Sequence, residues 1–485
     1  MWNEFFQQED LGAILPQLEL VLFACGILVM DLLLDRRHKY ANALIALVGI
    51  AFSAYPLWGM WQRGYEELAF NGLIVVDPFF LFFSFIFLLA AAVVILMSVK
   101  YFEIEKEHEG EYYALILFAT AGMMFLAGGV DLITLFIGLE LMAICFYLLT
   151  GFLRHDRRSN EAALKYFLLG VFSTGILAYG FSLLYGVSGT TKIYQIADAV
   201  RERGLDDPVV FLAMVAVAAG LFFKVAAVPF HQWAPDAYEG APTPITAFIS
   251  VGSKAAAFAL LLRLFLVAIA PLRPHWEVLL AIVAVATMTL GNLAAINQSN
   301  IKRLLAYSSI GHVGYILLGL VAGNETGHTG IAVYIFAYAA MTLGAFAVVT
   351  GMRRADLMGD RLEDMRGLMS KNPTAALLML IFLLSLTGIP PTVGFLGKYF
   401  IFLALIQTGH YYLVVFAALY VVVALYYYFR IVVMMFMQEA AEPGRMSFAP
   451  GLVAALAITA LLTLLPGLYP EPLIRFAQSS ILHFR

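Results

Sequence analysis

Apolar runs of about 20 residues, the length that an α-helix needs to cross a hydrocarbon core, follow one another along nearly the whole chain. Of the 485 residues, 62% are hydrophobic and only 13% are charged, whereas charged residues make up about a quarter of a soluble domain. The mean hydropathy is +0.87. The sequence therefore predicts an all-α polytopic membrane protein that forms one helical bundle.

Hydropathy predicts about fourteen transmembrane helices, an even number that would bring both termini to one side of the membrane. The first has no cleavage-site pattern behind it and is expected to be retained. The expected spans lie near 14–34, 41–60, 77–98, 112–129, 131–153, 163–187, 209–238, 243–269, 275–296, 301–322, 328–352, 373–405, 411–437 and 450–470.

The loops at one end of these spans hold clearly more Lys and Arg residues than the loops at the other end. Cytoplasmic loops carry this excess. We therefore expect both termini to face the periplasm of a bacterial inner membrane. The arginines expected in the cytoplasm are Arg36, Arg37, Arg154, Arg157, Arg158, Arg353 and Arg354.

Two expected spans combine a helix breaker with a lysine, one from Lys224 to Pro235 and the other from Pro390 to Lys398. Proline removes a backbone donor and clashes with the preceding turn, so each helix should be interrupted at membrane depth. A matched pair of interrupted spans points to inverted repeats. The expected parts are three helices in 1–111, two inverted five-helix repeats at 112–269 and 275–437, and a last helix in 438–485.

A few ionisable residues stand inside apolar runs, where a charge costs at least about 2.5–3.5 kcal/mol on insertion scales. Such side chains face the bundle interior and commonly mark an ion path. The candidate path residues are Glu140, Lys165, Lys224, Lys254 and Lys398.

Glu140 has no neighbouring charge in the sequence and needs a cationic partner from another helix. It could form a static ion pair that fixes helix packing, or it could tune a lysine, and we favour the second interpretation. Lys224 and Lys254 lie near the centres of consecutive spans, so antiparallel helices could bring them together. In general, burial and a second lysine lower the pKa of a lysine side chain, and a carboxylate raises it. Moving the carboxylate would therefore load or unload a proton.

Lys165 is only a few residues into its span, so snorkelling of its side chain to the cytoplasmic interface competes with a role in transport. Lys398 lies beyond the Pro390–Pro391 break with apolar residues on both sides, which favours a periplasmic outlet. His231 and His312 could extend a hydrogen-bonded chain, because imidazole donates and accepts near neutral pH, or they could be packing residues.

Other functional classes lack support in the sequence. The net charge of −4 is small and dispersed, which argues against a nucleic-acid partner. Cys25 and Cys145 fall inside apolar runs without C-x-x-C spacing, so no disulfide, zinc or iron–sulfur site is indicated. No cofactor is therefore expected in this chain, and any redox chemistry must occur in another one.

Several motifs resemble those of the proton-translocating, antiporter-like subunits of respiratory complex I, and the resemblance covers most of the chain. The motifs are Gly138-Leu-Glu140-Leu, Phe223-Lys224, Pro229-Phe-His231-Gln-Trp-Ala-Pro235-Asp236, Gly240-Ala-Pro242, Ser253-Lys254, and Asn300-Ile-Lys302-Arg303 continuing through Tyr307 to His312. Mrp-type sodium/proton antiporters share this ancestry, so these motifs leave the two classes open.

Other features resemble the subunit N branch of the family. The stretch from Gly388 to Lys398 looks like the signature of that branch, whereas subunit M is expected to carry Glu where Lys398 stands. The chain also ends soon after its last expected span, whereas subunit L continues into a long lateral helix.

The resemblance implies a role for each buried charge. Glu140 would pair with and modulate Lys224, and protons would pass by way of Lys254. Lys398 would exchange protons with the periplasm, and Lys165 would be an auxiliary partner. FMN, the iron–sulfur clusters and the quinone site would belong to other subunits of NADH-quinone oxidoreductase. The expected partners are the lipid bilayer, the neighbouring antiporter-like subunit M and the small subunits J and K.

Two alternatives stay open at this point. A Mrp-type cation/proton antiporter subunit would use the same lysines without a redox partner. A membrane scaffold of a hydrogenase-type complex would carry inert buried charges.

Overall fold

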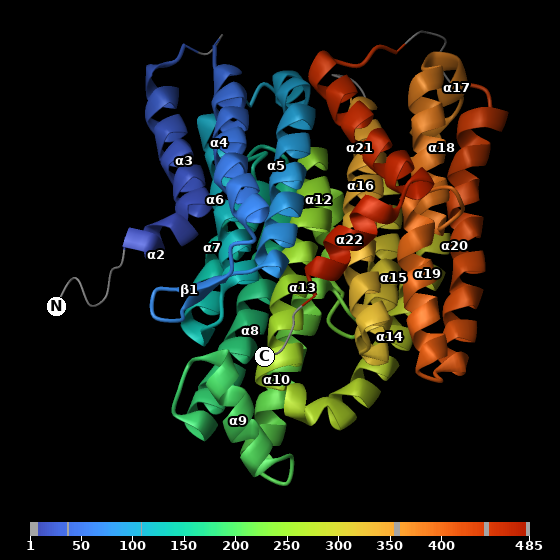
Figure 1. Cartoon of the computed structure of the whole chain (residues 1–485). Helices are drawn as coiled ribbons and strands as arrows, with labels where there is room; N and C mark the ends of the chain where they lie inside the picture. The colour runs from blue at the N-terminus through green and yellow to red at the C-terminus, as the bar shows by residue number, and fades with distance from the viewer. Residues whose placement is uncertain (1–7, 36–37, 108, 354–358, 441–445, 482–485) are drawn as a thin grey trace.

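A computed structural model describes residues 8–481 of the chain, apart from 36–37, 108, 354–358 and 441–445. Helices stand side by side in a single bundle, with short connections at its two ends (Figure 1). Within the described residues, 13 helices are long and apolar enough to cross a membrane. The prediction of an all-α polytopic membrane protein is therefore confirmed.

These long helices follow the expected spans closely. They are α3 (Leu15–Leu33), α4 (Ala41–Arg63), α5 (Pro78–Glu105), α6 (Gly110–Gly128), α7 (Leu132–Thr150), α8 (Arg157–Ser188), α10 (Pro208–Val225), the run of α12 (Thr243–Phe248), η1 (Ile249–Ser253), α13 (Lys254–Arg263) and η2 (Leu264–Ala268), the run of η3 (Ala270–Leu272) and α14 (Arg273–Ile296), α15 (Ile301–Ala322), α16 (Glu325–Gly351), α20 (Tyr411–Met437) and α21 (Pro450–Leu468).

The remaining expected span, 373–405, is formed by two shorter apolar helices, α18 (Pro373–Thr387) and α19 (Val393–Gln407). The other proline-rich span is also interrupted, because α10 ends at Val225 and the chain resumes as the short helix α11 (Trp233–Gly240). Both interruptions lie where the prolines predicted them. The interruption expected within the span 209–238 is therefore confirmed.

Side chains of Asp and Asn begin many of the spans, because their oxygen atoms accept hydrogen bonds from the first free N–H groups of a helix. Asp77 accepts from the N–H of Phe80 at the start of α5, at 2.7 Å. Further caps are Asp131 on α7, Asp156 on α8, Asp207 on α10, Asn300 on α15, Asn324 on α16 and Asn372 on α18. These polar residues mark where the helices that they cap begin.

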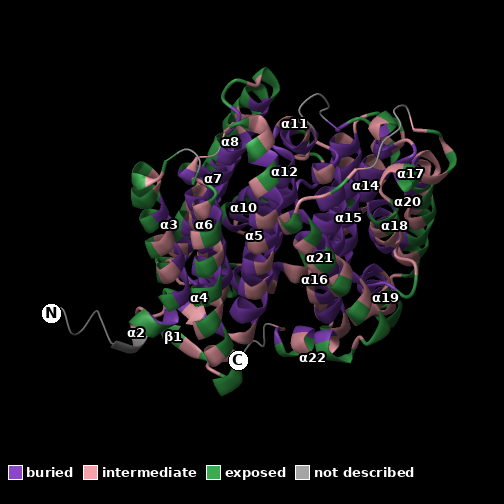
Figure 2. Ribbon diagram, turned by 90° about the horizontal axis from the view of Figure 1, so that it is seen from above, coloured by how far each residue is buried: buried purple, intermediate pink, exposed green. Residues whose placement is uncertain are grey.

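The run from α12 to η2 lies at the centre of the bundle. Seen from above, buried residues gather on the inner helices and exposed residues on the outer ones (Figure 2). Every residue in the apolar window of this run is buried, whereas only 28% of the corresponding window is buried in α3 and in α20. Two π-helical turns, η1 and η2, flank α13. Such turns occur frequently at functional sites.

Several short elements were not expected from hydropathy. They are α2 (Gln8–Ala13), the antiparallel strands β1 (Glu67–Ala69) and β2 (Ile74–Val76), α9 (Ile193–Arg203), η4 (Leu362–Met365), α17 (Leu368–Lys371) and α22 (Glu471–Ser479). Each precedes, connects or follows spans, and none is long enough to cross a membrane.

Both ends of the described chain lie at the end of the bundle that carries the β1–β2 hairpin. Asp10 accepts a hydrogen bond from the N–H of Phe70, 2.7 Å away, in the hairpin turn. On α22, the ring of Phe476 packs against Trp61, near the hairpin end of α4, at 4.4 Å between centroids. The expectation that both termini share one side agrees with this arrangement. Of the arginines expected in the cytoplasm, Arg36, Arg37 and Arg354 lie outside the described residues.

Candidate functional site

Lys224 is buried in the last turn of α10, directly before the interruption of that helix. Its Nζ donates a hydrogen bond to Oγ1 of Thr174 on α8, at 2.9 Å. After Val225 the backbone turns at Ala226, which has a φ of 61°. The lysine thus stands where a helix ends inside the protein and meets a hydroxyl group.

Glu140 lies near the middle of α7. Its Oε1 is buried and, among the described residues, has no hydrogen-bond partner. The carboxylate acts electrostatically on Lys224, but no ion pair within 4.0 Å joins these two described side chains. The structure therefore holds the expected partners near one another and out of direct contact.

Lys254 is the first residue of α13 and follows the π-helical turn η1. Its buried Nζ donates to Oγ of Ser309 on α15. The hydroxyl of Tyr238 lies 3.4 Å from the same Oγ, and the ammonium lies 5.4 Å from the centroid of the Tyr238 ring. Lys254 is therefore surrounded by hydroxyl and aromatic groups.

His312 lies on α15, and Lys398 of α19 and Lys254 of α13 both act on it electrostatically. Its Nδ1 shares a hydrogen bond with the hydroxyl of Tyr334 at 2.7 Å, and its Nε2 lies 3.2 Å from the hydroxyl of Tyr428. A cavity of about 10 Å³ adjoins Lys254, Ser309 and His312. This is about the room that one water molecule needs.

Lys398 is buried on α19, beyond the second interruption. Its Nζ donates to the carbonyl oxygens of Leu386 at 3.0 Å and Thr387 at 2.7 Å. These carbonyls belong to the last turn of α18, where free C=O groups give the helix end a partial negative charge. The ammonium also lies 4.9 Å from the centroid of the Tyr315 ring. The broken helix thus builds the binding site for its own lysine.

We expect Gly388→Ala to lower several-fold the proton translocation that the sequence motifs imply, because this glycine shapes the Lys398 site. Its φ is +89°, and an added Cβ would lie 2.8 Å from Cδ of Lys398. A left-handed conformation costs an alanine roughly 1–2 kcal/mol, and the lysine would have to move. Proton pumping in membrane vesicles measures the effect. Gly186→Ala is the control, since nothing lies within 4 Å of its added Cβ, and equal pumping by both variants would contradict the expectation.

His231 lies in the interruption between α10 and α11 and is partly buried. Its Nδ1 is buried without a hydrogen-bond partner in the described part of the chain. Among the described residues, no hydrogen bond joins His231 to Lys224, Lys254 or Lys398, so its expected role in a hydrogen-bonded chain stays a prediction.

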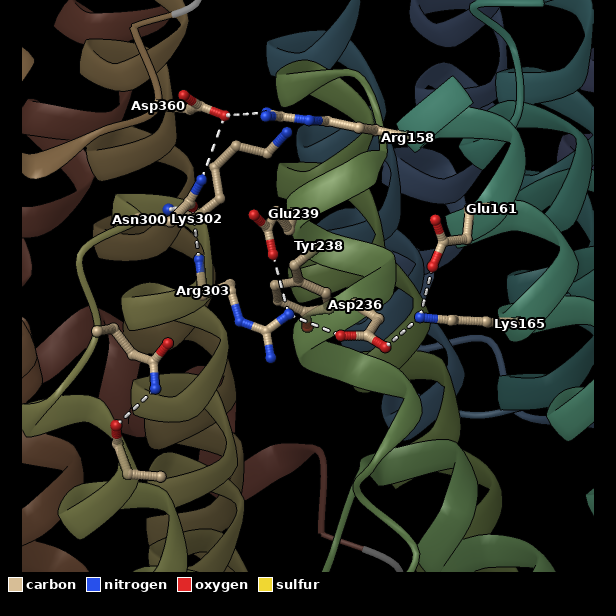
Figure 3. A network of polar contacts seen from close by, with 12 residues as sticks. Arg158, Glu161, Lys165, Asp236, Tyr238, Glu239, Asn300, Lys302, Arg303 and Asp360 are labelled. Atoms are coloured by element: carbon tan, nitrogen blue, oxygen red, sulfur yellow. Dashed lines mark hydrogen bonds and ion pairs between the residues drawn. The ribbon is translucent and has the colours of Figure 1, made fainter. Parts of the chain in front are cut away.

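Lys165 belongs to a different environment from the other predicted lysines. It lies on α8 with 46% of its side chain exposed, and its Nζ pairs with Glu161 at 2.8 Å and Asp236 at 3.0 Å. Arg303 of α15 donates to Asp236 at 2.6 Å and to Glu239 at 2.9 Å. Figure 3 shows this network of ion pairs, which joins α8, α11 and α15. Lys165 is therefore separated from the buried lysines.

Sequence reasoning missed a fully buried charge, Arg263 at the end of α13. Its guanidinium pairs with Asp77 at 2.8 Å and donates to the carbonyl oxygen of Ala127 through Nε at 2.9 Å and Nη2 at 2.7 Å. It also lies 4.6 Å from the centroid of the Phe79 ring. Arg263 is an ionisable residue inside the apolar run 260–265, and the lysines were chosen for the same reason.

The hydroxyl groups next to the lysines were also missed. Thr174 and Ser309 are 50 and 55 residues from the lysines that they adjoin, and Tyr238 belongs to a different helix from Lys254. Within the described residues, no group of three or more His, Cys, Asp or Glu side chains could hold a metal ion. Separately, the lysine, imidazole and hydroxyl groups of this interior are hydrogen-bonded to one another, and groups of these kinds can exchange protons.

Comparisons with known proteins agree with this picture. Residues 129–424 match the NADH:quinone oxidoreductase/Mrp antiporter transmembrane family. NADH-quinone oxidoreductase subunit N 2 of Solibacter usitatus is 57% identical over 485 residues, which cover 98% of each chain. A chain of respiratory complex I from Thermus thermophilus is 32% identical, with a TM-score of 0.80 over 95% of this chain and 98% of that one.

A chain of the Mrp complex from Dietzia has a TM-score of 0.83 over 96% of this chain and 97% of that one, but it is 22% identical. That likeness concerns the fold alone. The near full-length relative favours the oxidoreductase branch over the antiporter branch that the motifs left open. The chain therefore belongs to the NADH:quinone oxidoreductase/Mrp antiporter family, and within it to the NADH-quinone oxidoreductase subunit N group.

Proposed function

We propose that this chain translocates protons as a membrane subunit of NADH-quinone oxidoreductase, coupled to electron transfer from NADH to quinone in other subunits. One observation carries the proposal. Lys224, Lys254 and Lys398 are buried, and the described residues supply them with hydroxyl or carbonyl oxygens in place of carboxylate ion pairs. A buried lysine without a fixed counter-ion can exist charged or neutral, as a proton carrier must.

The proton route runs along the centre of the bundle. Glu140 modulates Lys224 by moving between a close and a separated position. Protons then pass to Lys254, and His312 with its tyrosine partners lies between that lysine and Lys398. Lys398 exchanges protons with the periplasm, while His231 and Lys165 are auxiliary. The route crosses both proposed repeats, 112–269 and 275–437.

The complex supplies the parts that this chain lacks. FMN, the iron–sulfur clusters and the quinone site belong to other subunits, and the neighbours in the membrane are subunit M and the small subunits J and K. The membrane is the bacterial inner membrane. Both termini face the periplasm, as the excess of Lys and Arg at the opposite end of the bundle indicates.

Glu140→Gln tests the proposal in the assembled complex. Glutamine keeps the size of the side chain but carries no negative charge, so it cannot modulate Lys224. NADH-driven proton pumping in membrane vesicles should therefore be largely lost. The control is Glu202→Gln, which neutralises an exposed glutamate on α9. Normal pumping by Glu140→Gln, with the complex intact on a native gel, would rule out a modulating role for this carboxylate.

A further inference from the structure

Two neighbouring residues of α8 hold α11, the short helix that follows the first interruption. Nζ of Lys165 pairs with Asp236 of α11 at 3.0 Å. At the next residue of α8, the ring of Tyr166 stacks on Trp233 of α11, with 4.5 Å between centroids and an angle of 7° between ring planes. Figure 3 shows the side chain of Lys165 pointing to Asp236. On its α8 side, α11 is therefore held by a polar contact and an aromatic contact.

Trp233 connects this contact to the end of α10. Its Nε1 donates a hydrogen bond to the carbonyl oxygen of Phe223 at 2.9 Å, and Phe223 directly precedes Lys224. The free carbonyls in the last turn of a helix need such partners when they are buried. The indole of Trp233 thus provides a hydrogen-bond donor for a carbonyl in the last turn of α10, at the residue before Lys224.

The other side of Tyr166 meets the helix that carries Glu140. Tyr147 lies seven residues after Glu140, two turns along the same face of α7. Its ring packs edge-on against Tyr166, with centroids 4.8 Å apart and an angle of 86°. An added Cβ on Gly170 of α8 would lie 2.1 Å from the Tyr147 hydroxyl, so the ring fits closely against α8. Tyr147, Tyr166 and Trp233 are all buried.

We infer that Tyr166 is a positioning residue, which holds Trp233 and the end of α10 in register with α7 and so sets the placement of Lys224 relative to Glu140. This inference rests on the proposed function of these two charges. Glu140 and Lys224 lie on different helices and have no direct contact within 4.0 Å, so their separation depends on how α7 and α10 are held. The rings of Tyr147, Tyr166 and Trp233 provide a continuous packed connection between those helices.

The same arrangement assigns a role to Lys165. Its ammonium is partly exposed and lies on Asp236, so it secures the outer end of the contact between α8 and α11. Lys165 thus acts on transport through the position of α11, without carrying a proton itself.

The stack is tested by comparing Tyr166→Leu with Tyr166→Phe in the complete complex. Leucine removes the stacked ring, whereas phenylalanine keeps it. We expect the ratio of protons moved to NADH oxidised to fall to a small part of its normal value in Tyr166→Leu, and to stay normal in Tyr166→Phe. Tyr179→Leu, the same change at an exposed position of α8, should leave the ratio unchanged. A normal ratio for Tyr166→Leu would overturn the inference, and so would a ratio that falls equally in Tyr166→Leu and Tyr166→Phe.

The ion pair provides a second comparison that does not depend on a buried ring. Lys165→Gln removes the contact with Asp236, whereas Glu161→Gln removes only a partner four residues away on α8. We expect the ratio of protons to NADH to fall for Lys165→Gln alone, and equal ratios for both variants would contradict the role of Lys165. Normal pumping by Lys224→Ala would contradict the proposed function. If pumping depends on Lys224 but Tyr166→Leu behaves as Tyr166→Phe does, the proton route is retained and only the positioning role of Tyr166 is wrong.

Discussion

Replacing Lys224 with alanine should abolish NADH-driven proton pumping by vesicles that carry this complex. The ammonium is buried at the broken end of α10 and bound to Oγ1 of Thr174, and alanine leaves no group there that can bind a proton. General acid–base groups commonly contribute about 10²–10⁴-fold to a rate. We therefore expect the pumping rate to fall by at least about 100-fold.

The experiment requires a control for assembly and a control for charge. A native gel shows whether the complex is intact, because a buried substitution can also prevent assembly. Lys100→Ala removes an exposed lysine that pairs with Glu103, and it should pump normally. Normal pumping by an intact Lys224→Ala complex would make this lysine structural and would favour a membrane scaffold.

Hydropathy and proline predicted most of the architecture because both act locally. A span is defined by its own apolar length, and α18 and α19 are separated where Pro390 and Pro391 prevent a continuous helix. The same reasoning placed the interruption after Lys224. It could not predict α9, α22 or the β1–β2 hairpin, because short elements at the membrane surface need no long apolar run.

The candidate lysines show what sequence position leaves open. Depth along a span follows from the sequence, but the direction of a side chain around the helix depends on how helices pack. Lys254 points into the bundle and meets Ser309, whereas Lys165 lies at the surface among Glu161 and Asp236. Partners such as Ser309 are far away in sequence and carry no charge, so only the folded chain brings them together.

Arg263→Ala should strongly destabilise the protein, with a cost of about 3–5 kcal/mol for breaking a buried ion pair. The guanidinium is 0% exposed and binds both Asp77 and the carbonyl oxygen of Ala127. Alanine would leave the carboxylate of Asp77 without its counter-ion and the carbonyl without its donors. We expect little assembled complex in membranes, as a native gel would show, and a lower midpoint of thermal inactivation.

A double variant separates the charge from the packing. In Arg263→Met with Asp77→Asn, neither partner carries an unpaired buried charge, and such neutral replacements are often tolerated. Asparagine at 77 can still accept from the N–H of Phe80 and begin α5. We therefore expect the double variant to assemble better than Arg263→Ala. The exposed pair of Arg201 and Asp198 provides the control, because surface pairs contribute only about 0–1 kcal/mol. Equal stability of Arg263→Ala and Arg201→Ala would contradict this expectation. It would mean that the ion pair of Arg263 with Asp77 does not hold α13, the helix that begins at Lys254, in place.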